Sequence, residues 1–351
     1  MPIQTQFPSG FNQKYVRYLL RDRFLTAVSA PLPSTRIAIP GPGSLVKVTD
    51  SNNDASIAGG QLRIPSVVGD LDPSYYWRQA DSNGFSRVNG RALVISAQGS
   101  PWVGWSNSIT LATSSLLYGA KERSVIDAGT EYQQALTTGD PTHIIVLEST
   151  GAWHYCRHGT NEFRCWRYPS GNDAILWPAI LGQTSNYDSI YVYDVTLPAV
   201  TSQLTTPAQG DPFSHPLSSF YFEVTVTTRS TNADTYISFA RQDDDNRLFL
   251  VISPAGAVSL YKRVGGVQTT EKVIFGNGVI TSGSRIIIQW SAPEQFVTTS
   301  GNRFKVWGGS SFYDSSLSAA AQTLLDASSS GLISIKPSNC TLTNLICASF
   351  T

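Results

Sequence analysis

The sequence predicts an all-β protein built from two β-sandwich or jelly-roll domains. Short apolar runs follow one another at roughly ten-residue spacing, and turn residues separate them. Many of the runs alternate apolar and polar residues, as a strand with one buried face does. The clearest runs are RALVISA, THIIVLES, AWHYCRH, SIYVYDVTL, FYFEVTVTT, TYISFAR, RLFLVIS, AVSLYKRV, RIIIQWS and RFKVWGG. This succession favours two packed antiparallel sheets over an α/β fold.

Helical patterns are nearly absent from the chain. Only residues 13–24 and residues 316–327 have a sequence compatible with a short helix. We therefore expect at most two helices, one near each end of the chain.

A change in composition divides the chain of 351 residues. Residues 197–218 are rich in Pro, Ser and Thr and lack periodicity, which is typical of a linker. We predict an N-terminal arm over residues 1–20, a first sandwich over 21–200, a linker over 201–218 and a second sandwich over 219–351.

The composition restricts the partners of the protein. Hydrophobic residues make up 41% of the chain, and 25 basic residues balance 25 acidic ones. A neutral chain lacks the basic surface that nucleic acid or an anionic membrane would require, so we expect neither partner. No run of about 18 apolar residues is present, so we expect no membrane span.

The N-terminus lacks the basic start, apolar centre and cleavage site of a signal peptide. We therefore expect the protein to stay inside the cell or to leave without a secretion signal, for example in a virus particle released by lysis.

Asp243, Asp244 and Asp245 lie between two apolar runs. Asp and Asn stabilise tight turns, so these residues are interpreted as a hairpin turn. Their carboxylates are also candidate ligands for Ca²⁺, although the spacing of an EF-hand loop is missing. No other cofactor is indicated.

The same segment carries a resemblance to a known family. Its pattern is met by Arg241, Asp244, Asn246, Gly256, Val258, Leu260, Lys262 and Gly265. This pattern resembles the central meander of concanavalin A-like and laminin-G-like jelly rolls, in which the stretch is largely structural. The resemblance implies two concanavalin A-like domains.

The first half resembles modules of phage tail and virion-associated proteins. The resemblance rests on RDRF, PGPGS, VTDSNNDASIAGGQLRI, PSYYW, VGWSNS, and ILWPAI before YVYDVTLP. It implies a structural protein of a bacteriophage particle, a tail, fibre or capsid-decoration component assembled in the host cytoplasm. Other virion proteins, further copies of the chain and host-surface glycans would be its partners. The alternative is a carbohydrate-binding lectin of a cell surface.

Catalytic patterns are missing from the sequence. Glucanases of this fold carry acidic residues at alternate positions of one strand, and no glutamate here has an acidic partner two residues further on. The chain also lacks the G-x-S-x-G, H-E-x-x-H and phosphate-loop motifs. We therefore expect a protein without enzymatic activity.

The four cysteines form two close pairs, Cys156 with Cys165 and Cys340 with Cys347. If each pair brackets a hairpin turn, its members lie directly cross-strand and two disulfides are compatible with the sequence, reduced thiols being the alternative. The run HYCRH also places His154, Cys156 and His158 on one strand face, a conceivable zinc site with Cys165 across the hairpin.

Aromatic residues are the candidates for binding. Those that concentrate in the first half suit either a glycan surface or the core of a large sandwich; they are Trp102, Trp105, Trp153, Trp166 and Tyr168. In the arm, apolar anchors suit docking on a neighbouring subunit or folding back on the first domain; they are Phe7, Phe11, Tyr15 and Tyr18.

Overall fold

The computed structural model describes residues 18–349 apart from several short gaps. The gaps are 69–71, 100–101, 113–114, 122–123, 128–129, 134–140, 159–161, 183, 196–199, 205–212, 216–219, 291–303, 315, 328–330 and 337–339. The chain divides at residue 197 into two compact units, here called unit 1 and unit 2.

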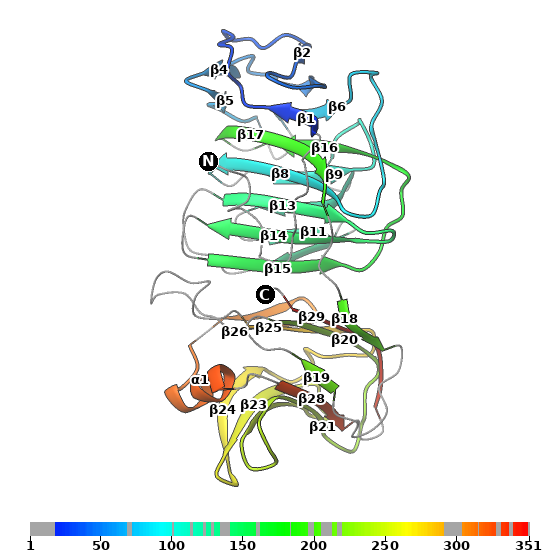
Figure 1. Ribbon diagram of the computed structural model, residues 1–351, viewed down its shortest axis with the longest axis vertical. Coiled ribbons are helices and arrows are strands. Elements are labelled where there is room, and N and C mark those ends of the chain that lie inside the picture. Colours follow the sequence, from blue (N-terminus) through cyan, green and yellow to red (C-terminus); the bar gives the residue numbers. More distant parts are fainter. Residues whose placement is uncertain are drawn as a thin grey trace. The chain divides into compact units, whose positions relative to one another are not determined.

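Unit 1 consists of two antiparallel sheets (Figure 1). One sheet contains β1 (Tyr18–Asp22), β4 (Ser56–Ala58), β5 (Gln61–Ile64), β8 (Arg91–Gln98), β13 (Pro141–Leu147), β14 (Ala152–His158), β15 (Glu162–Tyr168) and β17 (Ser185–Asp194). The other contains β2 (Thr35–Ile37), β3 (Ser44–Thr49), β6 (Ser74–Arg78), β7 (Phe85–Ser86), β9 (Trp102–Ser106), β10 (Leu116–Lys121), β11 (Ser124–Asp127), β12 (Thr130–Gln133) and β16 (Ile175–Leu181).

Unit 2 also consists of two antiparallel sheets, with one short helix (Figure 1). One sheet contains β18 (Val200–Leu204), β20 (Phe220–Thr228), β25 (Arg285–Trp290), β26 (Phe304–Gly308), β27 (Ser311–Asp314) and β29 (Thr341–Ser349). The other contains β19 (Phe213–His215), β21 (Thr235–Arg241), β22 (Arg247–Ile252), β23 (Val258–Val264), β24 (Val267–Phe275) and β28 (Gly331–Lys336), and the helix is α1 (Ala319–Ala327).

The two units follow the same strand path. In unit 1 the chain leaves β8 for the meander β9–β12, returns through β13–β15, and ends with β16 and β17 in opposite sheets. Unit 2 repeats this path with β20, β21–β24, β25–β27, β28 and β29. In both units the final strands insert beside the first ones, so that β17 pairs with β8 and β5 just as β29 pairs with β20 and β18. This is the order of a jelly roll, and the prediction of two jelly-roll β-sandwiches is confirmed.

Strand alternation places the core of unit 2 between its sheets. The side chains of Phe222, Ile237, Leu250 and Ile288 come from both sheets and belong to one buried cluster. Helix α1 adds Leu324 and neighbouring side chains to the same cluster, so it closes one side of this core. The helix falls within the predicted range 316–327.

Two regions differ from the sequence prediction. No helix forms in the described part of residues 13–24. Tyr18–Asp22 is instead strand β1, because it pairs with β17 and tertiary pairing overrides local propensity. The segment 201–218 is more than a linker, since β18 and β19 lie largely within it and pair with β29 and β28. Among the described residues, no helix is long and apolar enough to cross a membrane.

Candidate functional site

Unit 2 carries a row of aromatic side chains on the outer face of its meander sheet. The row consists of Tyr236 on β21, Phe249 on β22 and Tyr261 on β23, here called the aromatic row. The Phe249 and Tyr261 rings stack with centroids 5.5 Å apart, and the Tyr236 ring lies 6.2 Å from that of Phe249. Guanidinium Cζ of Arg247 lies 5.6 Å from the Phe249 centroid, in cation–π geometry.

Alternation and register build this row. Each member follows or precedes a core residue, since Ile237, Leu248 and Leu260 belong to the buried cluster. Phe249 lies directly opposite Tyr261 in the ladder, and cross-strand neighbours on one face are in contact. The sequence does not reveal the row, because its residues lie on three different strands. The one signal in the sequence is that each of them alternates with core positions, which indicates an outward-facing side chain.

The turn between β21 and β22 fixes one end of the site. Asp243 accepts the N–H groups of Asp245 and Asn246 at 2.8 and 2.7 Å, the geometry expected of an Asp-stabilised turn. The Asn246 side chain accepts the N–H of Gly265 at 3.0 Å and so ties this turn to the next hairpin. The Asn246 side-chain amide also donates to the Asp243 carboxylate at 3.1 Å, and this bond, ahead of the two backbone N–H bonds, lowers the pKa of Asp243.

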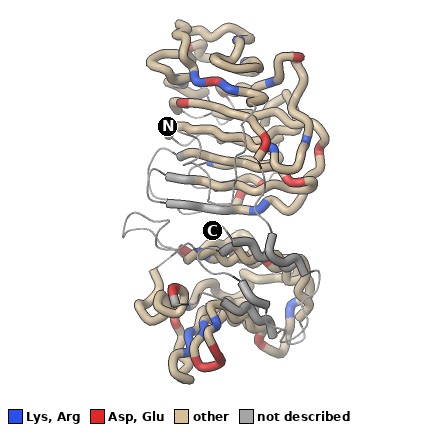
Figure 2. The backbone as a smooth tube through the Cα atoms, viewed as in Figure 1, with Lys and Arg blue, Asp and Glu red and all other residues tan. Residues whose placement is uncertain are grey.

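Arginines oppose the remaining carboxylates of the turn, where Figure 2 shows an acidic loop beside basic strand ends. Asp244 lies 2.6 Å from Arg241 and 3.6 Å from Arg247, and Asp245 lies 3.7 Å from Arg263. Each aspartate considered as a Ca²⁺ ligand is therefore engaged within the chain. The structure places these residues in the turn that the sequence predicts.

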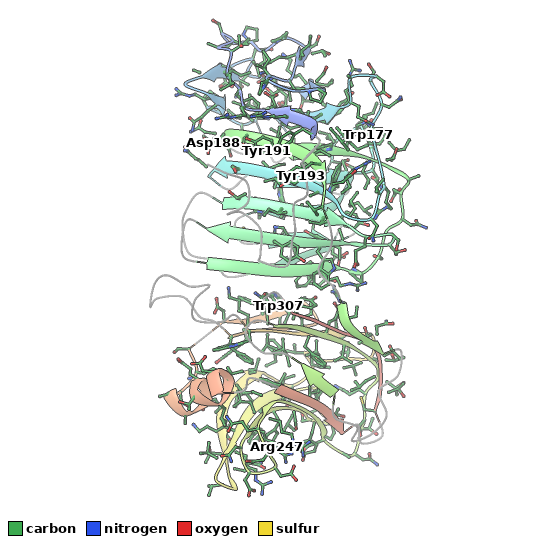
Figure 3. All side chains as sticks on the ribbon, in the orientation of Figure 1. Trp177, Asp188, Tyr191, Tyr193, Arg247 and Trp307 are labelled. Atoms are coloured by element: carbon green, nitrogen blue, oxygen red, sulfur yellow. The ribbon has the colours of Figure 1, made fainter. Side chains whose placement is uncertain are left out.

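Two groups at this surface have shifted pKa values, Tyr236 and Arg247. Burial raises the pKa of Tyr236, and the Asp234 carboxylate beside it raises the pKa further. Burial lowers the pKa of Arg247 from a very high value, while Asp244 opposes that change. At neutral pH the face thus presents aromatic rings, hydroxyl donors and guanidinium donors together (Figure 3, Arg247).

The aromatic candidates of the first half do not form an exposed platform. All five are buried, with exposed fractions from 0% to 5%. Trp105 donates to the carbonyl of Ile145 at 3.2 Å, and Tyr168 donates to the carbonyl of Gly119 at 2.7 Å. A large two-sheet sandwich needs bulky side chains to fill its interior, and the polar atoms of Trp and Tyr then require buried partners.

Trp102 belongs to a separate cluster on the meander sheet of unit 1. It packs with Tyr76, Leu116 and Leu181, and Trp177 lies against the same cluster (Figure 3). The Lys121 ammonium lies 4.3 Å from the Trp102 ring centroid. Both units therefore carry apolar side chains on this sheet, and in each the central ring is buried, since Trp102 is 5% exposed and Phe249 is 3% exposed.

Tyr18, predicted as a docking residue of the arm, contacts its own unit. Its ring lies 5.6 Å from that of Tyr191 and 5.7 Å from that of Tyr193, both on β17 (Figure 3). The last residues of the predicted arm therefore belong to a sheet of unit 1. Phe7, Phe11 and Tyr15 lie outside the described residues.

The cysteines do not lie in the directly paired positions expected. Register places Cys156 opposite Arg164 and Cys165 opposite Tyr155, one residue away from a direct cross-strand pair. Cys340 and Cys347 do not bracket a hairpin, because residues 341–349 form the single strand β29. Seven residues of extended strand span about 23 Å, whereas a disulfide needs Cα atoms about 6 Å apart, so these two cannot pair within the chain.

The residues that the structure describes contain one group able to hold a metal ion, His143, His154 and Cys156. The group keeps two members of the zinc site considered from the sequence and adds His143 from the neighbouring strand. The structure does not describe the side chains of His158 and Cys165.

Comparisons with known proteins give only distant likenesses. No family model matches the chain, and no curated protein matches its sequence. A carbohydrate-binding module of family CBM66 from Bacillus subtilis is 12% identical, with a TM-score of 0.27, over 42% of this chain and 91% of its own. Domains LG4-5 of the mouse laminin alpha1 chain are 10% identical, with a TM-score of 0.23, over 81% and 89%.

A third structure comes from work on endo-acting O-glycanases of human gut microbiota. It is 11% identical with a TM-score of 0.33, over 50% of this chain and 99% of its own. All these TM-scores are too low to carry an argument. The strand order therefore defines the class of protein: an all-β chain of two jelly-roll sandwiches.

Proposed function

We propose that the protein is a non-enzymatic structural component of a bacteriophage particle, in the tail, a fibre or the capsid decoration, which adheres to host-surface glycans. The aromatic row of unit 2 carries the adhesion part of this proposal. Its two tyrosine rings are partly exposed beside arginine donors on the outer face of a sheet, and Phe249 on the strand between them is 3% exposed.

The chemistry of this face suits a sugar ring. Tyr236 and Tyr261 are half-buried, so each offers part of its ring to the apolar side of a pyranose. Arg247 keeps 25% of its side chain exposed and can donate to sugar hydroxyls from the edge of the row. Contacts of this kind are weak singly, and several copies in a particle would add their affinities.

The proposal that the protein has no enzymatic activity rests on its carboxylates. Glu223 is 2.9 Å from Arg285, and Glu271 is 2.7 Å from Lys262, so both glutamates are neutralised in ion pairs. No glutamate of the chain has an acidic residue two positions further on, and together these observations support binding without hydrolysis. The viral context is supported by the resemblance of the first half alone.

A glycan array with the purified chain tests adhesion. We expect binding to a restricted set of glycans, with affinity reduced about fivefold in Tyr261→Ala, since one stacked ring contributes roughly a kilocalorie per mole. Val267→Ala is the matched control, because Val267 is 66% exposed on β24, pairs with Val264, and lies away from the row. Equal binding by both variants, or no binding by the wild type, would remove the adhesion proposal.

Gold-labelled antibody microscopy of particles and cells tests the location. Label at a fixed position on particles supports the virion role. Label on cell envelopes with bare particles would replace it with the alternative of a cell-surface lectin.

A further inference from the structure

The side chains of His143, His154 and Cys156 meet in the interior of unit 1. His143 lies on β13 directly opposite Cys156 on β14, and His154 precedes Cys156 by two residues. Residues two apart in a strand, and residues opposite each other in a ladder, share a face. The three side chains therefore converge on one side of the β13–β14 hairpin.

This side of the hairpin faces the core. His154 lies opposite Trp166 on β15, and its ring lies 6.4 Å from the ring of Tyr168. Tyr168 donates its hydroxyl to the carbonyl of Gly119 in the facing sheet, so the shared face points between the sheets. The three residues have exposed fractions of 1%, 0% and 0%.

The donor atoms are spaced as a small metal ion requires. Nδ1 of His143 lies 3.1 Å from Nε2 of His154, and the donor atoms of all three residues lie within 4.8 Å of one another. Around tetrahedral zinc, bond lengths of about 2.1 Å to nitrogen and 2.3 Å to sulfur place donors about 3.3–3.7 Å apart. The donor separations would therefore have to change by about 1.2 Å or less to close the site.

We propose that unit 1 binds one Zn²⁺ ion through Nδ1 of His143, Nε2 of His154 and Sγ of Cys156. Two imidazoles and a thiolate form the borderline-soft donor set that zinc prefers to hard oxygen ligands. On binding, the Cys156 thiol releases its proton to solvent, and both imidazoles bind as neutral rings. A water molecule or a fourth side chain completes the tetrahedron.

The ion would have a structural role. Its ligands come from two adjacent strands and are buried, so the metal would fix the β13–β14 hairpin within the core. The corresponding hairpin of unit 2, β25–β26, contains neither histidine nor cysteine. Unit 2 therefore has no equivalent site on these strands, and the proposal does not depend on glycan binding there.

Titration of the full chain with Co²⁺ under reducing conditions tests the site. We expect a thiolate-to-cobalt charge-transfer band with the visible bands of tetrahedral cobalt, saturating at one ion per chain and displaced by Zn²⁺. Cys156→Ser should lose the charge-transfer band. Cys340→Ser is the matched control, because this cysteine is half-buried in unit 2 and should leave the band unchanged.

Wild-type measurements keep the test decisive if a variant fails to fold. Zinc should raise the Tm of the chelator-treated wild type, and X-ray absorption should give one sulfur ligand and two imidazole ligands among the four ligands of the ion. Absence of the cobalt band from the wild type, an unchanged Tm with zinc, or a band that survives Cys156→Ser would overturn the proposal.

Discussion

Glu271 joins three elements of unit 2 at one carboxylate. Its side chain lies on β24 and is 2% exposed. It accepts a hydrogen bond of 2.7 Å from the ammonium of Lys262 on β23. The N–H and hydroxyl of Ser318 also donate to it, and the Ser318 hydroxyl in turn accepts the N–H of Ala321 in the first turn of α1. Burial raises the pKa of Glu271, but the bonds from Lys262 and Ser318 outweigh it, so the net pKa is lowered.

Glu271→Gln should reduce the free energy of unfolding by about 2 kcal/mol at neutral pH, because it leaves the partly buried ammonium of Lys262 without its counter-charge. A lowered folded-state pKa means that the stabilisation is complete above the unfolded value of about 4.3 and disappears as pH falls through the folded value. Urea unfolding of wild type and variant from pH 7 to pH 3 should therefore show converging stabilities.

Glu131→Gln is the control for this prediction. Glu131 is 48% exposed and lies 3.5 Å from Lys121, so its loss should change stability by about 0.5 kcal/mol or less. A constant difference between wild type and Glu271→Gln over the whole pH range would contradict the proposed cause.

At the scale of elements, glycines allow neighbouring strands to approach. Gly104 lies in the middle of β9, opposite Gly119 of β10. A Cβ atom built on Gly104 would lie 2.1 Å from the carbonyl oxygen of Tyr118, a backbone atom that cannot move aside alone. The β9–β10 ladder therefore requires glycine at this position.

Gly104→Ala should lower the free energy of unfolding by about 3 kcal/mol, because the methyl group must separate two paired strands. Gly276→Ala is the matched control, since its Cβ would meet nothing within 4 Å. Chemical denaturation measures both variants, and equal stabilities would contradict the close approach of β9 and β10.

At the scale of the whole molecule, one strand path occurs twice with separate cores. The buried cluster of unit 2 contains only residues of unit 2, among them Leu250. In unit 1, Ile145 is 1% exposed on β13. Each unit thus has the interior that an independently folding domain needs.

Calorimetry of the full chain should show two unfolding transitions. Leu250→Ala should reduce the free energy of unfolding of unit 2 by about 2–5 kcal/mol, because buried contacts are lost and a cavity is created. The transition of unit 1 should stay at its temperature. Ile145→Ala should destabilise unit 1 and leave the transition of unit 2 at its temperature. A single transition that both variants shift alike would show that the units unfold together.

The candidate sites show how far sequence reasoning reaches. The turn at Asp243 is predictable, because Asp and Asn bond to their own backbone and need no distant partner. The sequence does not reveal the aromatic row, and of the histidine–cysteine group it brings together only His154 and Cys156. Tyr236 joins Tyr261, and His143 joins Cys156, only once strands have paired in one register.

The sequence by itself determined the all-β class, most strand positions, the turns and helix α1, because alternation and turn chemistry are local. Only the tertiary structure decided which face of each strand is buried. It placed Trp105 and Trp166 in the interior and Tyr261 partly in solvent, and it turned residues 18–22 into a strand and part of the expected linker into β18 and β19. Aromatic side chains serve a core or a surface equally well, and pairing between distant strands settles which.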